Sequence, residues 1–409
     1  MPVAPWAEIT YKRNSFAESA CSTYNWKDMG AENPQKILNR QFVLACLSQF
    51  TLCFAYTLLI PTLPIHLSRS GSTEIEIGVL IGILNISSMI LRPFVGRALL
   101  KLSERTFMLS GTLLFSLSSI AYLWASPFWA LLIVRVFQGI AMAFFYTASI
   151  IFVTNIAPIA RRGQSLSYFY LAFHLSFAVA PSLGMFLINQ SGFTLLFLVC
   201  TGLSLCSVFI TFKLEARPVD PLEHQSIQDQ PLFVRETLSP VIMVFIAGIV
   251  FGAVTAFFPL YALTHRMDNP GLFFTTFAVT VILGRLLAGR ILDLHSRRSV
   301  IWPCLIAYIV AMSILSCSST LPMFLLVAVI WGTGHAFLYP ALTAYTLDLA
   351  GSSPGPALGI FTAADELGGG LGPVIMGIVL RLTSYPIMFL CLALTAVINL
   401  SYLYFSSRK

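Results

Sequence analysis

The chain alternates between long apolar segments and short polar interruptions along most of its length. A helix that crosses a membrane needs about 20 mostly apolar residues. Twelve segments meet this requirement, and they begin near Gln41, Glu76, Thr106, Pro127, Gln164, Gly192, Pro240, Leu272, Val300, Pro322, Ala357 and Pro386. The pattern therefore predicts an all-α membrane protein with twelve transmembrane helices.

Two regions are too polar to cross a membrane. Residues 1–40 have no apolar core of the kind that a cleavable signal peptide needs, so we expect a cytoplasmic N-terminal tail. Residues 213–236 form the one long charged interruption, between the sixth and seventh apolar segments. This segment predicts a cytoplasmic linker between an N-terminal six-helix half, residues 41–212, and a C-terminal six-helix half, residues 237–409.

The composition agrees with a protein that is embedded in lipid. Hydrophobic residues make up 57% of the 409 residues and charged residues only 10%, whereas a soluble domain has about 25% charged residues. The net charge of +7 does not indicate a nucleic-acid partner, because the basic residues are scattered between apolar segments. The expected surroundings are a lipid bilayer.

The distribution of Lys and Arg predicts the orientation. If the N-terminus is cytoplasmic, 20 of the 24 Lys and Arg residues lie on that side, and Arg135 lies within a span. Only Arg69, Arg266 and Arg381 lie on the opposite side. Because cytoplasmic loops are enriched in Lys and Arg, both termini are expected in the cytoplasm, and the membrane is expected to be a bacterial inner membrane.

The chain also contains an internal repeat. The segment LRPFVGR, residues 91–97, aligns with GRLLAGR, residues 284–290, so that Arg92 matches Arg285 at an offset of 193 residues. The same offset relates Tyr146 to Tyr339, and an offset of 192 relates Pro181 to Pro373. In transporters built from repeated halves, the binding site lies near the middle of the membrane where the halves meet.

Several motifs carry a resemblance to a known family. The segment GRILDLHSRR, with Gly289, Asp293, Arg297 and Arg298, resembles the G-x-L-x-D-R-x-G-R-R signature of the major facilitator superfamily. The segment RVFQG, beginning at Arg135, resembles that family's R-x-x-Q-G element. The resemblance implies two pseudo-symmetric six-helix halves and a secondary transporter.

Three prolines lie in further segments that resemble the family. APSLG contains Pro181 and GPVIMG contains Pro373, and both are similar to an element of the family's exporters. PTLP, with Pro61, resembles the motif that closes the first helix. Because proline removes a backbone hydrogen bond and kinks a helix, we expect helix bends at these three positions.

The resemblance implies gating loops after the second and eighth spans, and one of them departs from the family pattern. Gly96 and Arg97 begin the first loop, in which Leu100 stands where the family carries Asp. In relatives this Asp is thought to latch the cytoplasmic gate. Only the second loop, with Gly289, Asp293, Arg297 and Arg298, keeps the acid. The alternative is that the basic residues of both loops only set the topology.

Five ionisable residues lie deep within apolar segments: Arg135, His174, His335, Asp365 and Glu366. A charged side chain at the centre of a bilayer costs about 2.5 to 3.5 kcal/mol. We therefore expect these residues to face a cavity, to pair or to be neutral. The alternative for each is a structural ion pair or hydrogen bond, whereas the resemblance implies proton coupling for Arg135.

The stretch FTAADELGGG, residues 361–370, places two of these acids side by side. Neighbouring residues point about 100° apart on a helix, so the two carboxylates cannot share one direction. Asp365 shares its stripe with Gly368 and Gly372, which predicts a contact between helices. Glu366 is therefore assigned to the cavity, where desolvation favours a protonated carboxyl group that a substrate could discharge.

The predicted function is proton-coupled antiport that exports a small organic molecule by alternating access, with the protein working as a monomer. The importing alternative is a proton-coupled symporter or facilitator of a nutrient, and a receptor or scaffold without transport is a third. Candidate substrate contacts are Tyr56, Asn85, Gln138, Tyr146 and Tyr339. No nucleotide-binding G-x-x-x-x-G-K-[ST] loop is present, and the sequence predicts no enzyme, no cofactor and no metal site.

Overall fold

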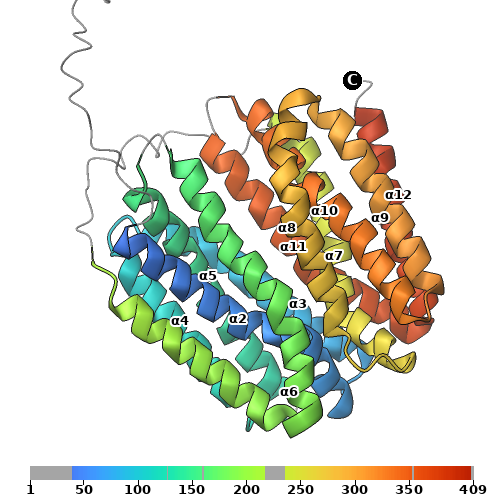
Figure 1. Cartoon of the computed structure of the whole chain (residues 1–409), viewed down its shortest axis with the longest axis horizontal. Coiled ribbons are helices and arrows are strands. Elements are labelled where there is room, and N and C mark those ends of the chain that lie inside the picture. Colours follow the sequence, from blue (N-terminus) through green and yellow to red (C-terminus); the bar gives the residue numbers. More distant parts are fainter. Residues whose placement is uncertain (1–38, 127, 159–160, 217–234, 352–353, 407–409) are drawn as a thin grey trace, which may run out of the picture.

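The computed structural model describes residues 39–126, 128–158, 161–216, 235–351 and 354–406, except for the side chains of residues 288–293. Over these ranges the chain forms helices joined by short turns, and no strand is present among them. Figure 1 shows two helical bundles side by side, one coloured blue to green and the other yellow to red. The predicted all-α fold is confirmed.

Each bundle follows the order of the predicted segments. The first contains α2 (Arg40–Arg69), α3 (Glu74–Ala98), α4 (Glu104–Ala121), α5 (Phe128–Ile156) and α6 (Arg162–Phe212). The second follows the short 3-10 helix η3 (Arg235–Thr237) and contains α7 (Leu238–Thr264), α8 (Gly271–Leu294), α9 (Arg297–Cys317), α10 (Leu321–Ala350), α11 (Pro354–Leu382) and α12 (Tyr385–Ser406). Every α-helix begins within about one turn of a predicted segment.

The long helix α6 contains both the fifth and the sixth predicted segments. Its 51 residues are interrupted at Gly192, whose backbone has φ 78° and ψ −176°. Glycine adopts such a positive φ readily because it has no Cβ. The sequence placed the start of the sixth segment at this residue, and Figure 1 shows the two parts of α6 running in different directions from the bend.

Nine of the described helices are long and apolar enough to cross a membrane when α6 is counted once. The short helix α4 is not among them, and α8 contributes only a shorter apolar stretch, Gly271–Leu287. The number of twelve crossings therefore stays a prediction. The boundaries of the two halves also stay a prediction, because residues 1–38 and 217–234 lie outside the described chain.

The two bundles meet along four pairs of helices: α3 with α11, α6 with α8, α2 with α7, and α3 with α7. Within the bundles, α3 packs on α5 as α8 packs on α10, and α4 packs on α5 as α9 packs on α10. The internal repeat in the sequence thus corresponds to a repeated arrangement of helices. The contact between α3 and α11 maps onto the contact between α8 and α6.

At one end of the molecule the bundles pack backbone against backbone. A Cβ added to Gly78 of α3 would collide with the Pro373 carbonyl of α11, and one added to Gly271 of α8 would collide with the Pro181 carbonyl of α6. The Ser182 and Thr275 hydroxyl oxygens lie 2.8 Å apart at the same end. We call this the sealed end.

At the opposite end the same helices have open space beside their glycines. A Cβ added to Gly96 of α3, Gly163 of α6, or Gly355 and Gly359 of α11 would meet no described heavy atom within 4 Å. Small residues at a helix contact let the backbones approach closely, which strengthens the packing of helices in lipid. The bundles are therefore held together closely at the sealed end and more loosely at the other, which we call the open end.

The three predicted bend positions, Pro61, Pro181 and Pro373, all lie inside helices. Pro181 and Pro373 take part in the sealed end through their carbonyl groups. Whether each proline bends its helix stays a prediction.

Candidate functional site

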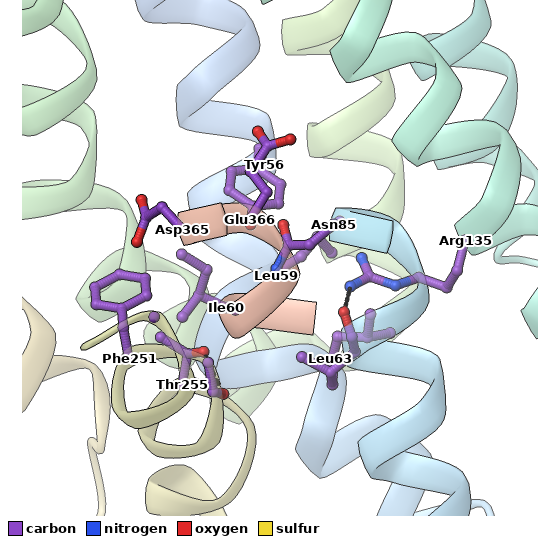
Figure 2. Close-up of a pocket in the computed structure, with 14 residues that line it drawn as sticks. Tyr56, Leu59, Ile60, Leu63, Asn85, Arg135, Phe251, Thr255, Asp365 and Glu366 are labelled. Atoms are coloured by element: carbon purple, nitrogen blue, oxygen red, sulfur yellow. Dashed lines mark hydrogen bonds between the residues drawn. The ribbon is translucent and has the colours of Figure 1, made fainter. Parts of the chain in front are cut away.

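A cavity of about 150 Å³ lies between the two bundles. That volume suffices for several water molecules or one small organic group. Helices of both bundles contribute side chains, and the lining residues are Tyr56, Leu59, Ile60, Leu63, Ile81, Asn85, Arg135, Gly248, Phe251, Gly252, Thr255, Asp365, Glu366 and Gly369. Figure 2 shows how the labelled residues are arranged around the part of α11 that carries the two acids.

Glycines bring α7 and α11 together at the cavity wall. A Cβ on Gly252 would collide with the backbone of Gly369, and one on Gly248 would lie 2.5 Å from the Asp365 carbonyl oxygen. Gly368 and Gly372 likewise face the α7 backbone at Phe245 and Ile249. The predicted small-residue stripe is thus the helix contact, and it places Asp365 at the junction of α7 and α11.

Both acids line the cavity, and their carboxylates point apart. Figure 2 shows Asp365 pointing toward the side of Phe251 and Glu366 pointing toward Tyr56. In the described chain Asp365 has no hydrogen-bond or ion-pair partner. Asp365 lies at the predicted contact with α7, where its Oδ1 atom would be 3.2 Å from a Cβ on Gly248, and its side chain also lines the cavity together with Glu366.

Glu366 forms an ion pair with Arg92 of α3. The exposed fraction of the side chain is 28% for Arg92 and 18% for Glu366, so the pair is partly shielded from solvent. The pair joins the two bundles across 274 positions of sequence. One acid of the cavity is thus neutralised within the protein, whereas the other is left to a ligand or a proton.

His174 of α6 contacts the guanidinium group of Arg285 of α8 through its Nε2 atom. The ring also packs against Phe173. This histidine is not among the cavity-lining residues. Its contact again joins the two bundles, this time across the α6 and α8 pair.

Arg135 of α5 reaches the cavity but is held by acceptors of its own bundle. Its Nε donates to the Leu80 carbonyl at 2.7 Å, and its two terminal nitrogens donate to the Gln138 side chain at 2.8 Å and the Ile81 carbonyl at 3.1 Å. The residue is only 4% exposed. This geometry favours the structural alternative, in which Arg135 ties α5 to α3.

We expect Arg135→Met to destabilise the protein without abolishing proton coupling. Interhelical hydrogen bonds in membranes contribute about 0.6 kcal/mol each, so loss of the two bonds to α3 should lower the free energy of unfolding by about 1 to 2 kcal/mol. Thermal unfolding of the purified protein measures this change, and Arg135→Lys is the matched variant that keeps the charge. A stable but uncoupled Arg135→Met protein would instead assign Arg135 to coupling.

Four other predicted site residues lie outside the lining of this cavity. Gln138 accepts hydrogen bonds from Arg135 and from the Tyr122 hydroxyl at 2.9 Å, and Tyr146 contacts Cys53 at 3.0 Å. His335 bonds to the Tyr308 hydroxyl at 2.8 Å, and Tyr339 packs on Phe361. None of the four is among the residues that line this cavity, which corrects their assignment to it.

Comparison with known proteins shows which family the chain belongs to. The sequence profile described as Major Facilitator Superfamily matches residues 45–273 and again 268–409. The chain belongs to the Major Facilitator Superfamily. It is 23% identical over 353 residues to the staphylopine export protein of Staphylococcus aureus, covering 82% of this chain and 88% of the relative.

Other relatives of this Major Facilitator Superfamily protein are named for drug resistance. It is 26% identical over 384 residues to multidrug resistance protein 2 of Bacillus subtilis, covering 87% of this chain and 93% of the relative. Among solved structures, the nucleoside transporter NupG aligns with a TM-score of 0.77 at 15% identity, covering 89% of this chain and 99% of that one. The structural likeness shows the fold alone, and the chain is a membrane transporter and not an enzyme.

The family's gating motifs lie at the open end. Arg297 pairs with Asp348 at 3.1 Å, and Arg298 donates to the Tyr345 hydroxyl at 3.0 Å, so both tie the start of α9 to α10. Gly96 lies beside open space, and Arg97 is exposed. The surroundings of Gly289 and the side chain of Asp293 lie outside what the structure describes, so the role of Asp293 as a gate latch stays a prediction.

Sequence reasoning missed two arginines and part of the cavity wall. Arg92 and Arg285 were counted only as charges that set the topology, but they contact Glu366 and His174 inside the fold. The signal that could have found them was the repeat, which aligns these two arginines with each other. Phe251 and Thr255 of α7 carried no sequence signal, because apolar and hydroxyl residues are common in any membrane helix.

Proposed function

We propose that this transporter exports a small organic molecule in exchange for protons, with Asp365 as the group that exchanges a proton for substrate. The observation that carries the proposal is the Asp365 carboxylate, which lines a cavity between the bundles without a partner in the described chain. An unpaired charge is costly inside a membrane. The carboxyl group therefore has to hold a proton or a positively charged ligand, and the two can replace each other.

Other cavity groups support a substrate with polar features. The side chains of Tyr56 and Asn85 line the cavity and make no hydrogen bond within the described chain. Phe251 contributes an aromatic face beside Asp365. A few polar groups on an otherwise apolar wall are typical of small-molecule sites, and these three side chains are available to orient a ligand.

The direction of transport is proposed from the relatives. One relative is named as an export protein for staphylopine, and another is named for multidrug resistance, which export of drugs would provide. If the termini are cytoplasmic, as the charge distribution predicts, the loosely packed end faces the cytoplasm and the cavity is sealed from the outside. The competing function is proton-driven import, and the fold that this chain shares with the nucleoside transporter NupG does not decide between the two directions.

Reconstituted vesicles with an imposed pH gradient test the proposal. The protein is incubated with a panel of nucleosides, quinolones, amines and metal chelators, and proton movement is followed with a pH-sensitive dye. We expect a panel member to accumulate on the acidic side of the membrane, because antiport moves the substrate against the proton flow. Accumulation on the alkaline side would assign symport, and transport that is indifferent to the gradient would assign facilitated diffusion.

A further inference from the structure

The two bundles touch through two arginine contacts that occupy equivalent positions of the repeat. Arg92 of α3 pairs with Glu366 of α11, and Arg285 of α8 contacts His174 of α6. Arg285 follows Arg92 by 193 residues, and Glu366 follows His174 by 192 residues. One contact therefore maps onto the other when the two halves are exchanged.

The same relation holds at the sealed end, which fixes where these contacts lie. Gly78 meets Pro373, and Gly271 meets Pro181, again with the halves exchanged. Each arginine lies 14 residues after its glycine along the helix, which is about 21 Å toward the open end. Both arginine contacts thus stand between the sealed end and the region where Gly96 and Gly359 have open space beside them.

One proton is enough to break either contact. A guanidinium group attracts an ionised carboxylate, and that attraction is lost when Glu366 is protonated. Neutral imidazole accepts a hydrogen bond from a guanidinium group, but protonated imidazole has no acceptor and carries the same charge as Arg285. Glu366 and His174 differ chemically, but protonation of either one weakens its contact with the arginine.

Few other charges surround these two acceptors. The groups that act electrostatically on His174 are Arg285 of α8 and His335 of α10. In α2 and α4, which also pack on α6, the only Asp, Glu, His, Lys and Arg residues lie at the helix ends, and α5 has only Arg135, which bonds to α3.

The surroundings of Glu366 are similarly sparse. Arg92 faces it from α3, Asp365 adjoins it on α11, and Tyr56 of α2 and Tyr339 of α10 lie within electrostatic range. The other packing neighbours of α11, namely α7 and α12, contain no Asp, Glu, His, Lys or Arg. Protonation of Glu366 therefore acts mainly through Arg92.

We propose that the Arg92–Glu366 and Arg285–His174 contacts are a matched pair of proton-released latches that hold the empty transporter in the conformation open at the Gly96 and Gly359 end. The proposal rests on the proposed function, since it takes the proton as the coupling ion. An antiporter must not change conformation when it carries neither proton nor substrate. Intact latches supply that restraint, and protonation of both acceptors removes it. Arg92 and Arg285 are positioning residues in this scheme.

Distances between spin labels test the latches without any substrate. In a cysteine-less background, one label pair is placed at Leu100 and Gly355 and a second at Gly163 and Leu287, all at the open end. Double electron–electron resonance is recorded on the full chain in lipid nanodiscs from pH 5 to pH 9. We expect long distances at high pH and a growing population of shorter distances as the pH falls.

Two neutral substitutions are expected to move this transition in opposite directions. Glu366→Gln imitates the protonated acid and releases one latch permanently, so the transition should move to higher pH. His174→Gln cannot acquire a charge but still accepts a hydrogen bond from Arg285, so the transition should move to lower pH. Lys101→Gln, which removes a positive charge just beyond the end of α3, is the control and should leave the transition unchanged.

A charge exchange separates a latch from a merely structural contact. Arg92→Glu alone places two acids together and should give the short distances at every pH. Combining it with Glu366→Arg restores an ion pair between the bundles and should return the long distances at high pH. Size-exclusion profiles and thermal unfolding confirm that each variant is folded before its distances are compared.

The proposal is overturned if Glu366→Gln and His174→Gln shift the transition in the same direction, or if neither shifts it. It is also overturned if the charge exchange behaves like Arg92→Glu alone. These outcomes are independent of the proposed function, which fails when no member of the panel is moved by a pH gradient. A pH-dependent change in the spin-label distances without gradient-driven transport would refute the proposed antiport but would support the latches.

Discussion

Asp365→Asn is expected to reduce transport driven by a proton gradient to the level of vesicles without protein, while exchange of substrate for substrate continues. Asparagine has nearly the size of aspartate and keeps a hydrogen-bonding head, but it cannot take up or release a proton. Since the Asp365 side chain has no partner in the described chain, the substitution should leave the fold intact. Gradient-driven accumulation and counterflow, measured on the same vesicles, separate the two activities.

Asp348→Asn is the matched control for this experiment. It makes the same chemical change near the C-terminal end of α10, where the Asp348 side chain is 53% exposed and pairs with Arg297 outside the cavity. Exposed ion pairs of this kind contribute about 0 to 1 kcal/mol, so coupling should survive. If Asp365→Asn still accumulates substrate against a gradient, the proton is carried elsewhere, and Glu366 is the next candidate.

Gly78→Leu and Gly271→Leu should each drive the protein away from the conformation described here. A Cβ at either position collides with the backbone of the opposite bundle, at Pro373 or Pro181. A backbone contact can be relieved only if the bundles part at the sealed end. Overpacking costs about 1 to 3 kcal/mol, which corresponds to a shift of about 5- to 150-fold in the conformational equilibrium.

The open-end spin-label distances measure this shift, and both variants should favour the short population. Because the two glycines are equivalent in the repeat, their effects should be similar in size and should add in the double variant. Gly202→Leu is the control, since a Cβ on Gly202 of α6 meets no described atom within 4 Å. Unchanged distances in both glycine variants would show that the sealed end tolerates separation without a change of state.

The cavity shows how far a helical pattern can assign a side chain. The glycine stripe of α11 correctly predicted a helix contact, and Gly368 and Gly372 do face α7. Asp365 shares that face, since its Oδ1 atom would lie 3.2 Å from a Cβ on Gly248 of α7, but its carboxylate also lines the cavity, which the stripe alone did not indicate. The helical pattern predicts which way a side chain points, but the distance between the packed helices decides which groups that side chain contacts.

The sequence by itself determined the order and approximate limits of the helices, the break at Gly192 and the repeat, together with the small set of ionisable residues within apolar segments. These features are local, because a run of apolar residues must satisfy its backbone as a helix in lipid wherever it lies. Only the tertiary structure decided which ionisable groups are paired. Glu366 meets Arg92 across 274 positions and His174 meets Arg285 across 111, while Asp365 is left at the cavity. Such pairing depends on how two bundles pack, and neither helix carries that information alone.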